Sequence, residues 1–334
     1  MKEICKILGR RDEDALVATI VSQRGSSPRG AGANMLITQA GRVCGSIGGG
    51  PVEYAAIRQG LTLLREGRSL RKSYRLRRND EEDLGMICGG DVDLLFQYIP
   101  RESPVRDLLR KGLDYIESTN QSLWLFIDLT NPRRWEIQLY GPGFPLTPGP
   151  VTPEEAASLA KPKTALLQGP NRCIYSEPIN TPGRVLIFGA GHVAQALEPV
   201  LSGLGFRCAV FDNRPEFLNP QKFSRSAKLE LIDYDHIDVP VSPEDYVIVM
   251  THNSDFQVLR RLIARDWAYL GCIGSKTKIA TIKERLLQEG AKEAVLNKMN
   301  APIGIKIRSE TPAEIAISIA GELILRRAER REIL

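Results

Sequence analysis

The residue with the widest chemical scope in this chain is Cys88, which stands directly before Gly89 and Gly90. A thiolate at this position could act as a nucleophile, carry sulfur as a persulfide or ligate a soft metal, provided that its setting is electropositive and partly exposed. The alternative is a buried, inert thiol, which is the commoner state of a free cysteine. The residues alone leave both interpretations open. The other five cysteines lie far apart without a Cys-x-x-Cys pair, which disfavours a locally spaced zinc site and a disulfide framework.

Three consecutive glycines in the segment GSIGGGPVE offer a different chemistry, the binding of an anion. Residues without side chains leave backbone N–H groups open, and Pro51 suits the first position of a helix whose N-terminus adds positive partial charge. A phosphate is therefore the first candidate ligand, and a tight turn packed against a neighbouring element is the alternative. The glycines concerned are Gly48, Gly49 and Gly50.

A dinucleotide-binding fingerprint, Gly-x-Gly-x-x-Ala, follows the apolar run RVLIF. In this pattern Gly189 permits a tight turn, Gly191 lets the backbone approach a pyrophosphate, and Ala194 lets helix and strand pack closely. Asp212 ends the next predicted strand and could accept a hydrogen bond from a ribose hydroxyl. His192 lies inside the glycine loop, where its imidazole could meet a phosphate. Glycines that serve only packing are the alternative, because a fold does not fix its ligand.

Five further side chains stand in loops that follow predicted strands. His252 comes directly after YVIVM, at the carboxyl end of a strand, where open α/β sheets hold ligands. Ser275 and Lys276 could place a hydroxyl and an ammonium on an anion, or form an ordinary helix cap. Arg24 and Arg29 could supply fork-shaped donors to a phosphate, or be solvated.

The secondary structure that must position these residues follows different patterns in the two halves of the chain. Up to about residue 100, apolar β-branched runs at 15–22, 35–38, 42–48 and 92–96 predict short strands, and the segment from Pro51 to about Glu66 predicts a helix capped by Gly67. Residues 105–118 have helical spacing, and 123–129 with 135–141 resemble a hairpin around Asn131-Pro132. Residues 142–183 carry nine prolines, which favours a connector with short strands over a regular core.

Beyond Pro182 strands alternate with helices, which predicts a parallel sheet covered on both faces. The strands are expected at 184–188, 207–212, 246–250 and 268–274, and the last helix from the Thr311-Pro312 cap towards Arg327. The fold class is therefore α/β, with an N-terminal mixed α/β domain and a C-terminal Rossmann-like domain. We expect a first domain at 1–100, a connector at 101–182 and the Rossmann-like domain at 183–334.

Composition excludes several functional classes for these 334 residues. The formal net charge is +5, but the basic residues are scattered, so nucleic acid is not expected as a partner, whereas an anionic small molecule fits. The charged N-terminal stretch lacks the apolar core of a signal peptide, and no run of some twenty apolar residues could span a membrane. We therefore expect a cytoplasmic protein without a membrane partner.

Taken together, these motifs resemble the XdhC/CoxI family of xanthine dehydrogenase accessory factors. RGSSPRGAGANMLIT, GSIGGGPVE and GMICGGDVDLL resemble its N-terminal domain, and VLIFGAGHVAQAL, VFDNRPEF, VIVMTHNSDF, YLGCIGSKTK and APIGIKIRSETPAEIAISIAGELI resemble its Rossmann domain. Only residues 100–180 carry no motif of the family.

The resemblance implies a maturation factor that binds molybdenum cofactor (molybdopterin) and helps to insert it, in sulfurated form, into a molybdenum hydroxylase such as xanthine dehydrogenase. It implies that GSIGGGPVE cradles part of a phosphorylated pterin or nucleotide, that Glu53 is the glutamate of that motif, and that Cys88 is the cysteine of its Cys-Gly-Gly element. Implied partners are the apo-hydroxylase and a cysteine desulfurase or cofactor-supply protein. With two domains and a connector, we also expect a homodimer.

Two positions depart from the family's pattern. Pro51 stands where many relatives carry a cysteine, and His252-Asn253-Ser254 stands where many carry His-Asp-His, so a metal site there lacks its second histidine. Two other functions remain open: an oxidoreductase that binds NAD(P) at the Rossmann fingerprint, and an interaction scaffold that binds a hydroxylase without a small ligand. A fluorescent oxidised pterin released from the purified protein would favour the maturation factor, and hydride transfer from NAD(P)H the oxidoreductase.

Overall fold

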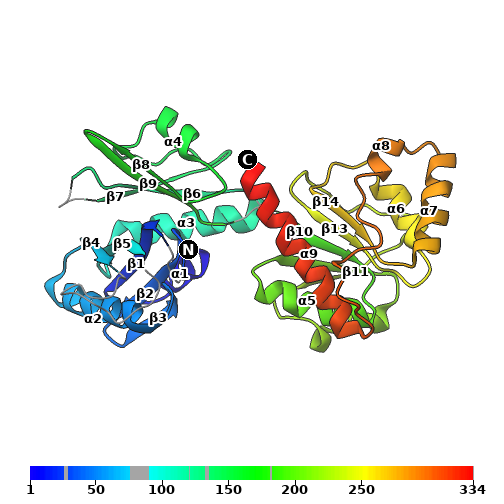
Figure 1. Ribbon diagram of the computed structural model, residues 1–334, viewed down its shortest axis with the longest axis horizontal. Helices are drawn as coiled ribbons and strands as arrows, with labels where there is room; N and C mark the ends of the chain where they lie inside the picture. Colours follow the sequence, from blue (N-terminus) through cyan, green and yellow to red (C-terminus); the bar gives the residue numbers. More distant parts are fainter. Residues whose placement is uncertain (26–28, 76–89, 120, 132–134, 181–182, 334) are drawn as a thin grey trace. The chain divides into compact units, whose positions relative to one another are not determined.

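The computed structural model describes residues 1–25, 29–75, 90–119, 121–131, 135–180 and 183–333. The chain divides into two compact units, Met1–Thr181 and Pro182–Leu334 (Figure 1). The predicted thiol Cys88, its neighbour Gly89 and the Asn131-Pro132 turn lie at least partly outside the described residues, so the fold does not test them.

The first unit is built on a five-stranded antiparallel sheet whose central strand, β1, is buried on both faces. Its apolar residues from Ala15 to Val21 face helix α2 on one side and a second layer on the other, which explains the continuous apolar run in the sequence. The order across the sheet is β3 (Gly41–Gly45), β2 (Asn34–Thr38), β1 (Ala15–Arg24), β5 (Asp91–Ile99) and β4 (Leu70–Arg75).

Helix α2 (Gly50–Glu66) covers one face of this sheet, as the apolar spacing predicts. Val52, Ala56 and Leu63 are fully buried against the strands, and Gly67 ends the helix in the left-handed conformation that glycine adopts without strain. The strand predicted at 42–48 is shorter, because β3 ends at Gly45 and the chain turns into the glycine loop.

The other face of the sheet packs against α1 (Lys2–Leu8), α3 (Pro104–Thr119) and a four-stranded antiparallel sheet. That sheet has the order β7 (Glu136–Tyr140), β6 (Trp124–Asp128), β9 (Arg172–Pro178) and β8 (Ala165–Gly169), and α4 (Pro153–Leu159) packs on it. The proline-rich segment, predicted as a connector with short strands, contains the two strands β8 and β9, and beyond the prediction it supplies α4 and core residues. Pro153 occupies the first turn of α4 behind a capping box formed by Thr152 and Glu155.

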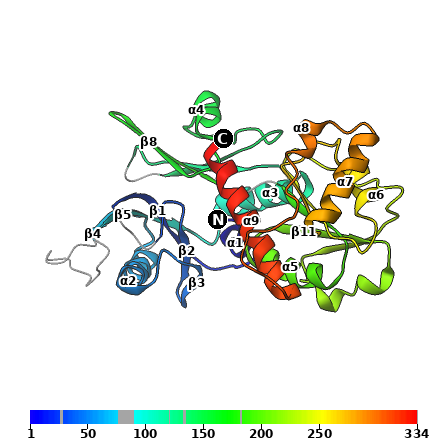
Figure 2. The same ribbon diagram turned by 45° about the vertical axis from the view of Figure 1, so that its right-hand side comes forward.

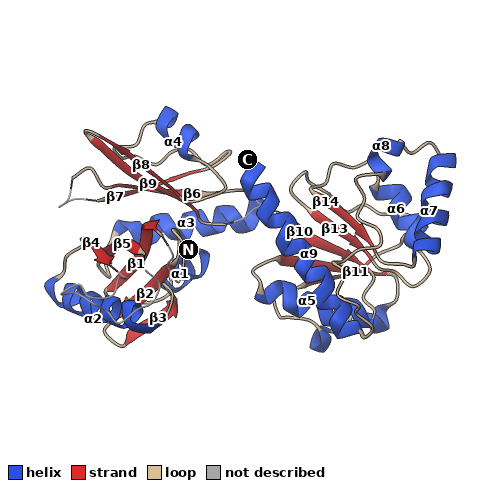
Figure 3. Cartoon of the chain, viewed as in Figure 1, coloured by secondary structure: helices blue, strands red, loops and turns tan. Residues whose placement is uncertain are grey.

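The second unit is a Rossmann-type domain, which confirms the predicted fold class. Its parallel sheet has the order β12 (Lys228–Leu231), β11 (Arg207–Asp212), β10 (Arg184–Phe188), β13 (Tyr246–Val249) and β14 (Tyr269–Cys272). Helices lie on both faces of the strands, as the colours of Figure 3 show. α5 (His192–Gly203) and α9 (Pro312–Ile333) lie side by side on one face (Figure 2), and α6 (Asp255–Leu262) and α7 (Lys276–Gln288) cover the other.

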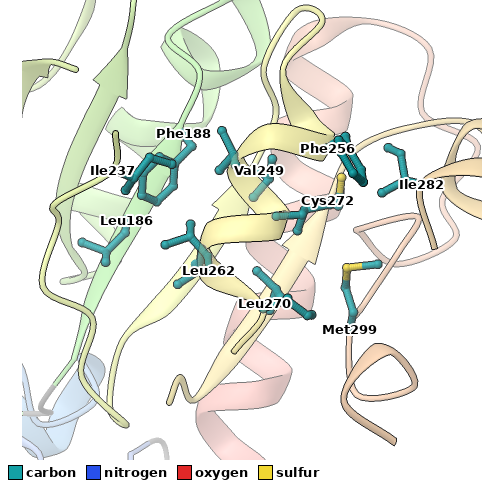
Figure 4. Packing of buried hydrophobic residues seen from close by; sticks show 14 of the residues in the cluster. Leu186, Phe188, Ile237, Val249, Phe256, Leu262, Leu270, Cys272, Ile282 and Met299 are labelled. Carbon is teal, nitrogen blue, oxygen red and sulfur yellow. The ribbon is translucent and has the colours of Figure 1, made fainter. Parts of the chain in front are cut away.

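Alternate residues of each central strand enter different cores. Leu186 and Phe188 of β10 pack with Val249 and Leu270 beneath α6 and α7, as Figure 4 shows, whereas Ile187 packs under α5 and α9. Each such side chain contributes about 1.5–3 kcal/mol through burial. This double coverage holds the loops at the carboxyl ends of the strands on a rigid base.

Within the described residues, five α-helices and strands have no counterpart in the sequence-based expectations. They are all short, and they are α1, β4, α4, β12 and α8 (Glu293–Leu296). In β4 only Tyr74 is buried, so no alternating apolar pattern announces the strand. Charged side chains are also what edge strands use to avoid pairing with other chains.

Candidate functional site

The glycine loop of the first unit connects β3 to α2 and depends on its glycines for its backbone shape. Gly48, Gly49 and Gly50 have φ angles of 131°, 72° and 63°, which residues with side chains rarely adopt. A Cβ atom added to Gly49 or Gly50 would meet nothing within 4 Å. The loop therefore needs glycine for conformation, and its outer side is open.

Glu53 organises this loop from inside. Its Oε2 accepts hydrogen bonds from Ser46 Oγ at 2.6 Å and from the N–H groups of Ile47 and Gly49 at 3.1 Å each, and Arg42 lies 3.7 Å from its other oxygen. Burial opposes ionisation of Glu53, but these donors outweigh it, so the pKa of the carboxyl is lowered. The anion at the start of α2 is thus the chain's own carboxylate.

For two of the three glycines, this arrangement corrects the expectation that their N–H groups stand open to a ligand. The N–H of Gly49 donates to Glu53, and that of Gly48 donates to Ser46 Oγ at 3.1 Å. A ligand at this loop would therefore face open space above Gly49 and Gly50 rather than a set of unused donors. Direct contact between Glu53 and a cofactor remains a prediction.

Antiparallel pairing brings several separate segments to one edge of the first sheet, which here means the row formed by the ends of neighbouring strands. β1 ends there at Arg24, β4 ends there at Arg75, and Gly90 leads into β5 at Asp91, which is the register partner of both arginines. β3 runs in the same direction as β1 and two strands away from it, but its last residue, Gly45, lies level with Ala18, six residues before Arg24 along β1. The predicted Arg24 and the end of the Cys-Gly-Gly element thus share one edge, whereas the glycine loop begins further back along the strands.

A polar cavity of about 270 Å³ opens at this edge. Arg24 lines it together with serines and aspartates of β1, β4 and β5, whereas the predicted Arg29 is exposed on the following loop. Gly90 is buried directly beside the cavity wall at Asp91. The signal for this cavity in the sequence was weak, because its polar residues lie in segments that read as strands or as a charged loop.

In the second unit, Gly189 and Gly191 have different reasons to be glycine. Gly189 has a φ of 110°, and a Cβ there would lie 2.4 Å from the carbonyl oxygen of Met250, so the ends of β10 and β13 approach too closely for any side chain. Gly191 is the N-cap of α5 with an ordinary φ of −68°, and a Cβ there would meet nothing within 4 Å. Only Gly191 keeps space free at the helix N-terminus.

Asp212 serves the protein's own structure rather than facing an open site. Its fully buried carboxylate accepts from the N–H of Ala190 at 2.7 Å and forms a two-pronged ion pair with Arg214 at 2.9 and 3.0 Å. Burial opposes its ionisation, but Arg214 and the two backbone donors lower the pKa of Asp212. The predicted hydrogen bond to a ribose would have to displace Arg214, a partner that sequence analysis did not assign.

The two predicted histidines lie at the same edge of the parallel sheet. His192 begins α5 after β10, and His252 follows the neighbouring strand β13; both are exposed. This is the place where the chain order across the sheet reverses, which is where open α/β sheets bind ligands.

A polar cluster of Thr251, Asp255 and Lys278, which the sequence analysis did not predict, lies at this edge. Asp255 is buried, accepts from the N–H and the hydroxyl of Thr251 at 2.9 and 2.6 Å, and forms an ion pair with Lys278. The predicted Ser275 is exposed and caps α7 by accepting from the N–H of Lys278 at 3.2 Å, and Lys276 is exposed beside it. The lysine in contact with a buried carboxylate is thus Lys278, two residues beyond the predicted one.

Over the described parts of the chain, no three or more His, Cys, Asp or Glu residues come together as a possible metal site. None of the described helices is both long and apolar enough to cross a membrane.

Comparison with known families matches both units. The model of the XdhC and CoxI family matches residues 8–75, and that of the XdhC Rossmann domain matches residues 185–323. Similarity to a solved structure covers nearly the whole chain: a xanthine dehydrogenase from Bacillus halodurans, with a TM-score of 0.82 and 24% identity, covers 98% of this chain and is itself covered to 96%. That likeness establishes the fold alone.

Three relatives align with more than nine-tenths of the chain. The uncharacterized protein YqeB of Escherichia coli K12 is 27% identical over 311 residues, and the chain spans only 42% of its length. A probable xanthine dehydrogenase subunit from Bacillus subtilis 168 is 27% identical over 325 residues and is covered to 93%. The molybdenum cofactor insertion chaperone PaoD of Escherichia coli K12 is 23% identical over 327 residues, which are 95% of this chain and 85% of PaoD.

Proposed function

The chain belongs to the XdhC and CoxI family, and from that premise we propose that it is a maturation factor that binds molybdenum cofactor and helps to insert it into a molybdenum hydroxylase. The observation that carries this proposal is the likeness to the insertion chaperone PaoD, which extends over 95% of the chain and therefore includes both units. A likeness confined to the Rossmann-type unit would have supported nucleotide binding only.

The geometry of the first unit fits an elongated, phosphorylated cofactor. Arg24 and the segment that begins at Gly90 share one sheet edge, and a Cβ at Gly49, in the loop that follows β3, would meet nothing within 4 Å. In the second unit, Gly191 leaves the N-terminus of α5 open to an anion. These are the places at which the chain would hold a pterin and its phosphate, and the bound cofactor would supply the redox-active metal to the hydroxylase.

Three finer parts of the proposal concern the form of the cofactor and the partners. We propose that the cofactor is delivered in sulfurated form, with Cys88 as the thiol that holds sulfur or a soft metal. The receiving partner would be an apo molybdenum hydroxylase such as xanthine dehydrogenase, and the supplying partner a cysteine desulfurase or a cofactor-supply protein. The Bacillus subtilis relative, whose name refers to xanthine dehydrogenase, supports the first partner.

Anaerobic purification tests the proposal directly. The full chain is expressed in cells that make molybdenum cofactor, and the purified protein is analysed for molybdenum and for the fluorescent pterin that oxidation releases. We expect both in a constant ratio to protein, together with activation of an added apo-hydroxylase. Protein that contains no pterin and activates no hydroxylase under these conditions would contradict the proposal.

A matched pair of glycine variants tests whether the loop holds the cofactor. Gly49 and Gly143 have nearly the same φ, 72° and 74°, and a Cβ would meet nothing within 4 Å at either position. Gly49→Asp and Gly143→Asp should therefore have a similar conformational cost, to which Gly49→Asp adds repulsion from the carboxylate of Glu53, so pterin is compared only in folded protein. Only Gly49→Asp adds a negative charge beside the start of α2, so only this variant should lose cofactor. Equal retention of pterin by the two variants would reduce the glycine run to a turn.

An oxidoreductase that binds NAD(P) is the second candidate, and it has less support. Asp212, which the fingerprint assigns to ribose, is engaged by Arg214 and by the N–H of Ala190. Titration with NADPH and with NADH, followed by fluorescence, separates the candidates. Saturable binding accompanied by hydride transfer would favour the oxidoreductase.

We also propose a homodimer. The chain consists of two compact units with their boundary between Thr181 and Pro182, and such a chain can exchange a unit with a second copy. Static light scattering at micromolar concentrations should give twice the mass of 37.1 kDa. A constant mass of one chain over this range would exclude the dimer.

A further inference from the structure

The polar cavity at the edge of the first sheet has an arrangement of hydrogen-bonding groups that discriminates between ligands. Its volume is about 270 Å³, near the lower limit for small-molecule sites. Ser22, Asp93 and Ser73 form one row across β1, β5 and β4, and Arg24, Asp91 and Arg75 form the next row towards the edge. The two rows are separated by two residues along the strands, or about 7 Å.

An irregularity in β1 aims these side chains. The register between β1 and β5 shifts between Ile20 and Ser22, so Val21 is an extra residue in β1. Val21 remains in the core beneath the second layer, while Ser22 becomes the partner of Asp93 and lines the cavity. Such a bulge re-aims side chains and is typical of functional edges.

Asp93 fixes the direction of both serine protons. Ser22 Oγ donates to its Oδ2 at 2.8 Å and Ser73 Oγ donates to its Oδ1, while Arg71 donates to Oδ2 at 3.2 Å. Burial opposes ionisation of Asp93, but these three donors lower its pKa, so it accepts at neutral pH. Each hydroxyl has a single proton, and both protons point at Asp93.

The three described side chains of the inner row, Ser22, Ser73 and Asp93, therefore present only acceptors to a ligand. The two serine oxygens turn their lone pairs towards the cavity, and a carboxylate has about four acceptor positions, of which Asp93 uses three. A phosphate would be repelled there. A simple cation is disfavoured as well, because the guanidinium groups of Arg24, Arg71 and Arg75 belong to the same patch of sheet.

Because the outer row has two guanidinium groups and one carboxylate, a ligand that satisfies both rows has adjacent N–H donors at one end and negative charge at the other. We propose that this cavity binds the 2-amino-4-oxopyrimidine edge of the pterin on Ser22, Ser73 and Asp93, with the phosphate directed towards Arg24. The amino group and the neighbouring ring N–H of that edge are two adjacent donors, which match an acceptor-only floor. This inference rests on the proposed function and names the part of the cofactor that the first unit recognises.

Binding of small pterins to the full chain tests the inference. The probes are 6-hydroxymethylpterin and its monophosphate, followed by their own fluorescence. Asp93→Asn replaces an acceptor with a donor and frees the serine protons, so it should weaken binding of both probes about 10- to 100-fold. Ser22→Ala combined with Ser73→Ala should weaken it about tenfold or more. This double variant decides the matter if the asparagine variant fails to fold.

Arg24→Gln separates the two rows. It should weaken binding of the monophosphate about fivefold or more and leave the unphosphorylated pterin unchanged. Matched controls come from the exposed face of α3, where Asp107 pairs with Arg110 and Ser118 Oγ donates to backbone carbonyls. Asp107→Asn and Ser118→Ala should bind both probes as the wild type does.

Nucleotides serve as the remaining probes, because guanine has the same adjacent amino group and ring N–H as the pterin and adenine does not. Pterin binding that is lost in the Asp93 and serine variants, with no binding of AMP, supports the inference. Tight binding of GMP without binding of the pterins would assign the cavity to a guanine nucleotide and overturn it. Cavity variants that still purify with molybdenum cofactor and activate the hydroxylase would also overturn it and leave the proposed function intact. Pterin binding here by a protein that activates no hydroxylase would instead count against the proposed function alone.

Discussion

Replacing Gly189 by alanine should lower the stability of the second unit, whereas replacing Gly191 by alanine should weaken ligand binding and leave stability unchanged, although both glycines belong to the same fingerprint. At Gly189 the new Cβ would lie 2.4 Å from the carbonyl oxygen of Met250 and 2.9 Å from the nitrogen of Thr251, and φ is 110°. A positive φ costs a residue with a Cβ about 1–2 kcal/mol. Pushing apart two packed backbones costs a further 1–3 kcal/mol, so we expect a loss of about 2–5 kcal/mol in total.

At Gly191 neither cost applies, because φ is −68° and the Cβ would meet nothing within 4 Å. Alanine is a poorer N-cap than glycine, but it also lowers the entropy of the unfolded chain, so the two effects offset each other to within about 0.5 kcal/mol. What Gly191→Ala should lose is binding, because the methyl group occupies the space in front of α5.

Differential scanning calorimetry of the full chain measures the first effect, and hydrogen exchange of peptides from β10 and β13 assigns it to the second unit. Gly189→Ala should lower the unfolding temperature of that unit by roughly 5–15 °C, and Gly191→Ala should leave it unchanged. Wild-type stability of Gly189→Ala would refute the close approach of the two strands. A large loss in Gly191→Ala would refute the open space at the helix N-terminus.

Three further outcomes follow from charged and reactive groups. Glu53→Ala leaves two loop N–H groups without their acceptor, which should cost about 2–4 kcal/mol, and millimolar sulfate should restore part of this stability in thermal melts of the variant but not of the wild type. Asp245 forms a buried ion pair with Arg184 that lowers the pKa of Asp245 against the effect of burial. Asp245→Asn should therefore be about 3 kcal/mol less stable in urea unfolding at pH 7. This difference should begin to shrink as the pH falls through about 4, where the unfolded carboxyl takes up a proton, and should vanish only below the lowered pKa of the folded carboxyl. Cys88 should react faster with iodoacetamide near neutral pH than the cysteines whose pKa burial raises to about 12, as measured by mass spectrometry. Cys88→Ser should fold but should not activate a hydroxylase. Slow labelling of Cys88, together with activity retained in the serine variant, would show that this thiol has no chemical role. The slow cysteines are Cys5, Cys208 and Cys272.

Local patterns predicted the elements of the second unit because strand and helix periods alternate there without interruption. The turn at Gly189 followed from the fingerprint, since a tight strand-to-helix turn requires a positive φ. The role of Asp212 did not follow, because it depends on competition between a ligand and Arg214. Two residues of separation place that guanidinium within reach of both carboxylate oxygens only when the chain bends as it does after β11. A sequence does not specify that bend.

In the first unit the sequence did not predict β4 or the cavity around Asp93, because polar residues form both the strand and the candidate site. β4 contains mostly charged or polar side chains, so its strand pattern is invisible until β5 pairs with it. The cavity around Asp93 depends on an extra residue in β1, and one residue of register decides whether Ser22 or Val21 opposes Asp93. Register is a property of the whole sheet, and no local window of sequence contains it.

The N-termini of α2 and α5 differ in whether the chain itself compensates their positive partial charge. At α2 the chain supplies its own anion, Glu53, so a phosphate there would meet both a carboxylate and donors already in use. At α5 the N-cap is Gly191, whose side-chain position is empty, and the adjacent Asp212 carries a guanidinium that neutralises it. Because an anion gains most where partial positive charge is not already compensated, α5 is the stronger phosphate site of the two. In the first unit the phosphate of a ligand is therefore not expected at the start of α2, which leaves Arg24, in the row next to Ser22, Ser73 and Asp93, as the group that would receive it.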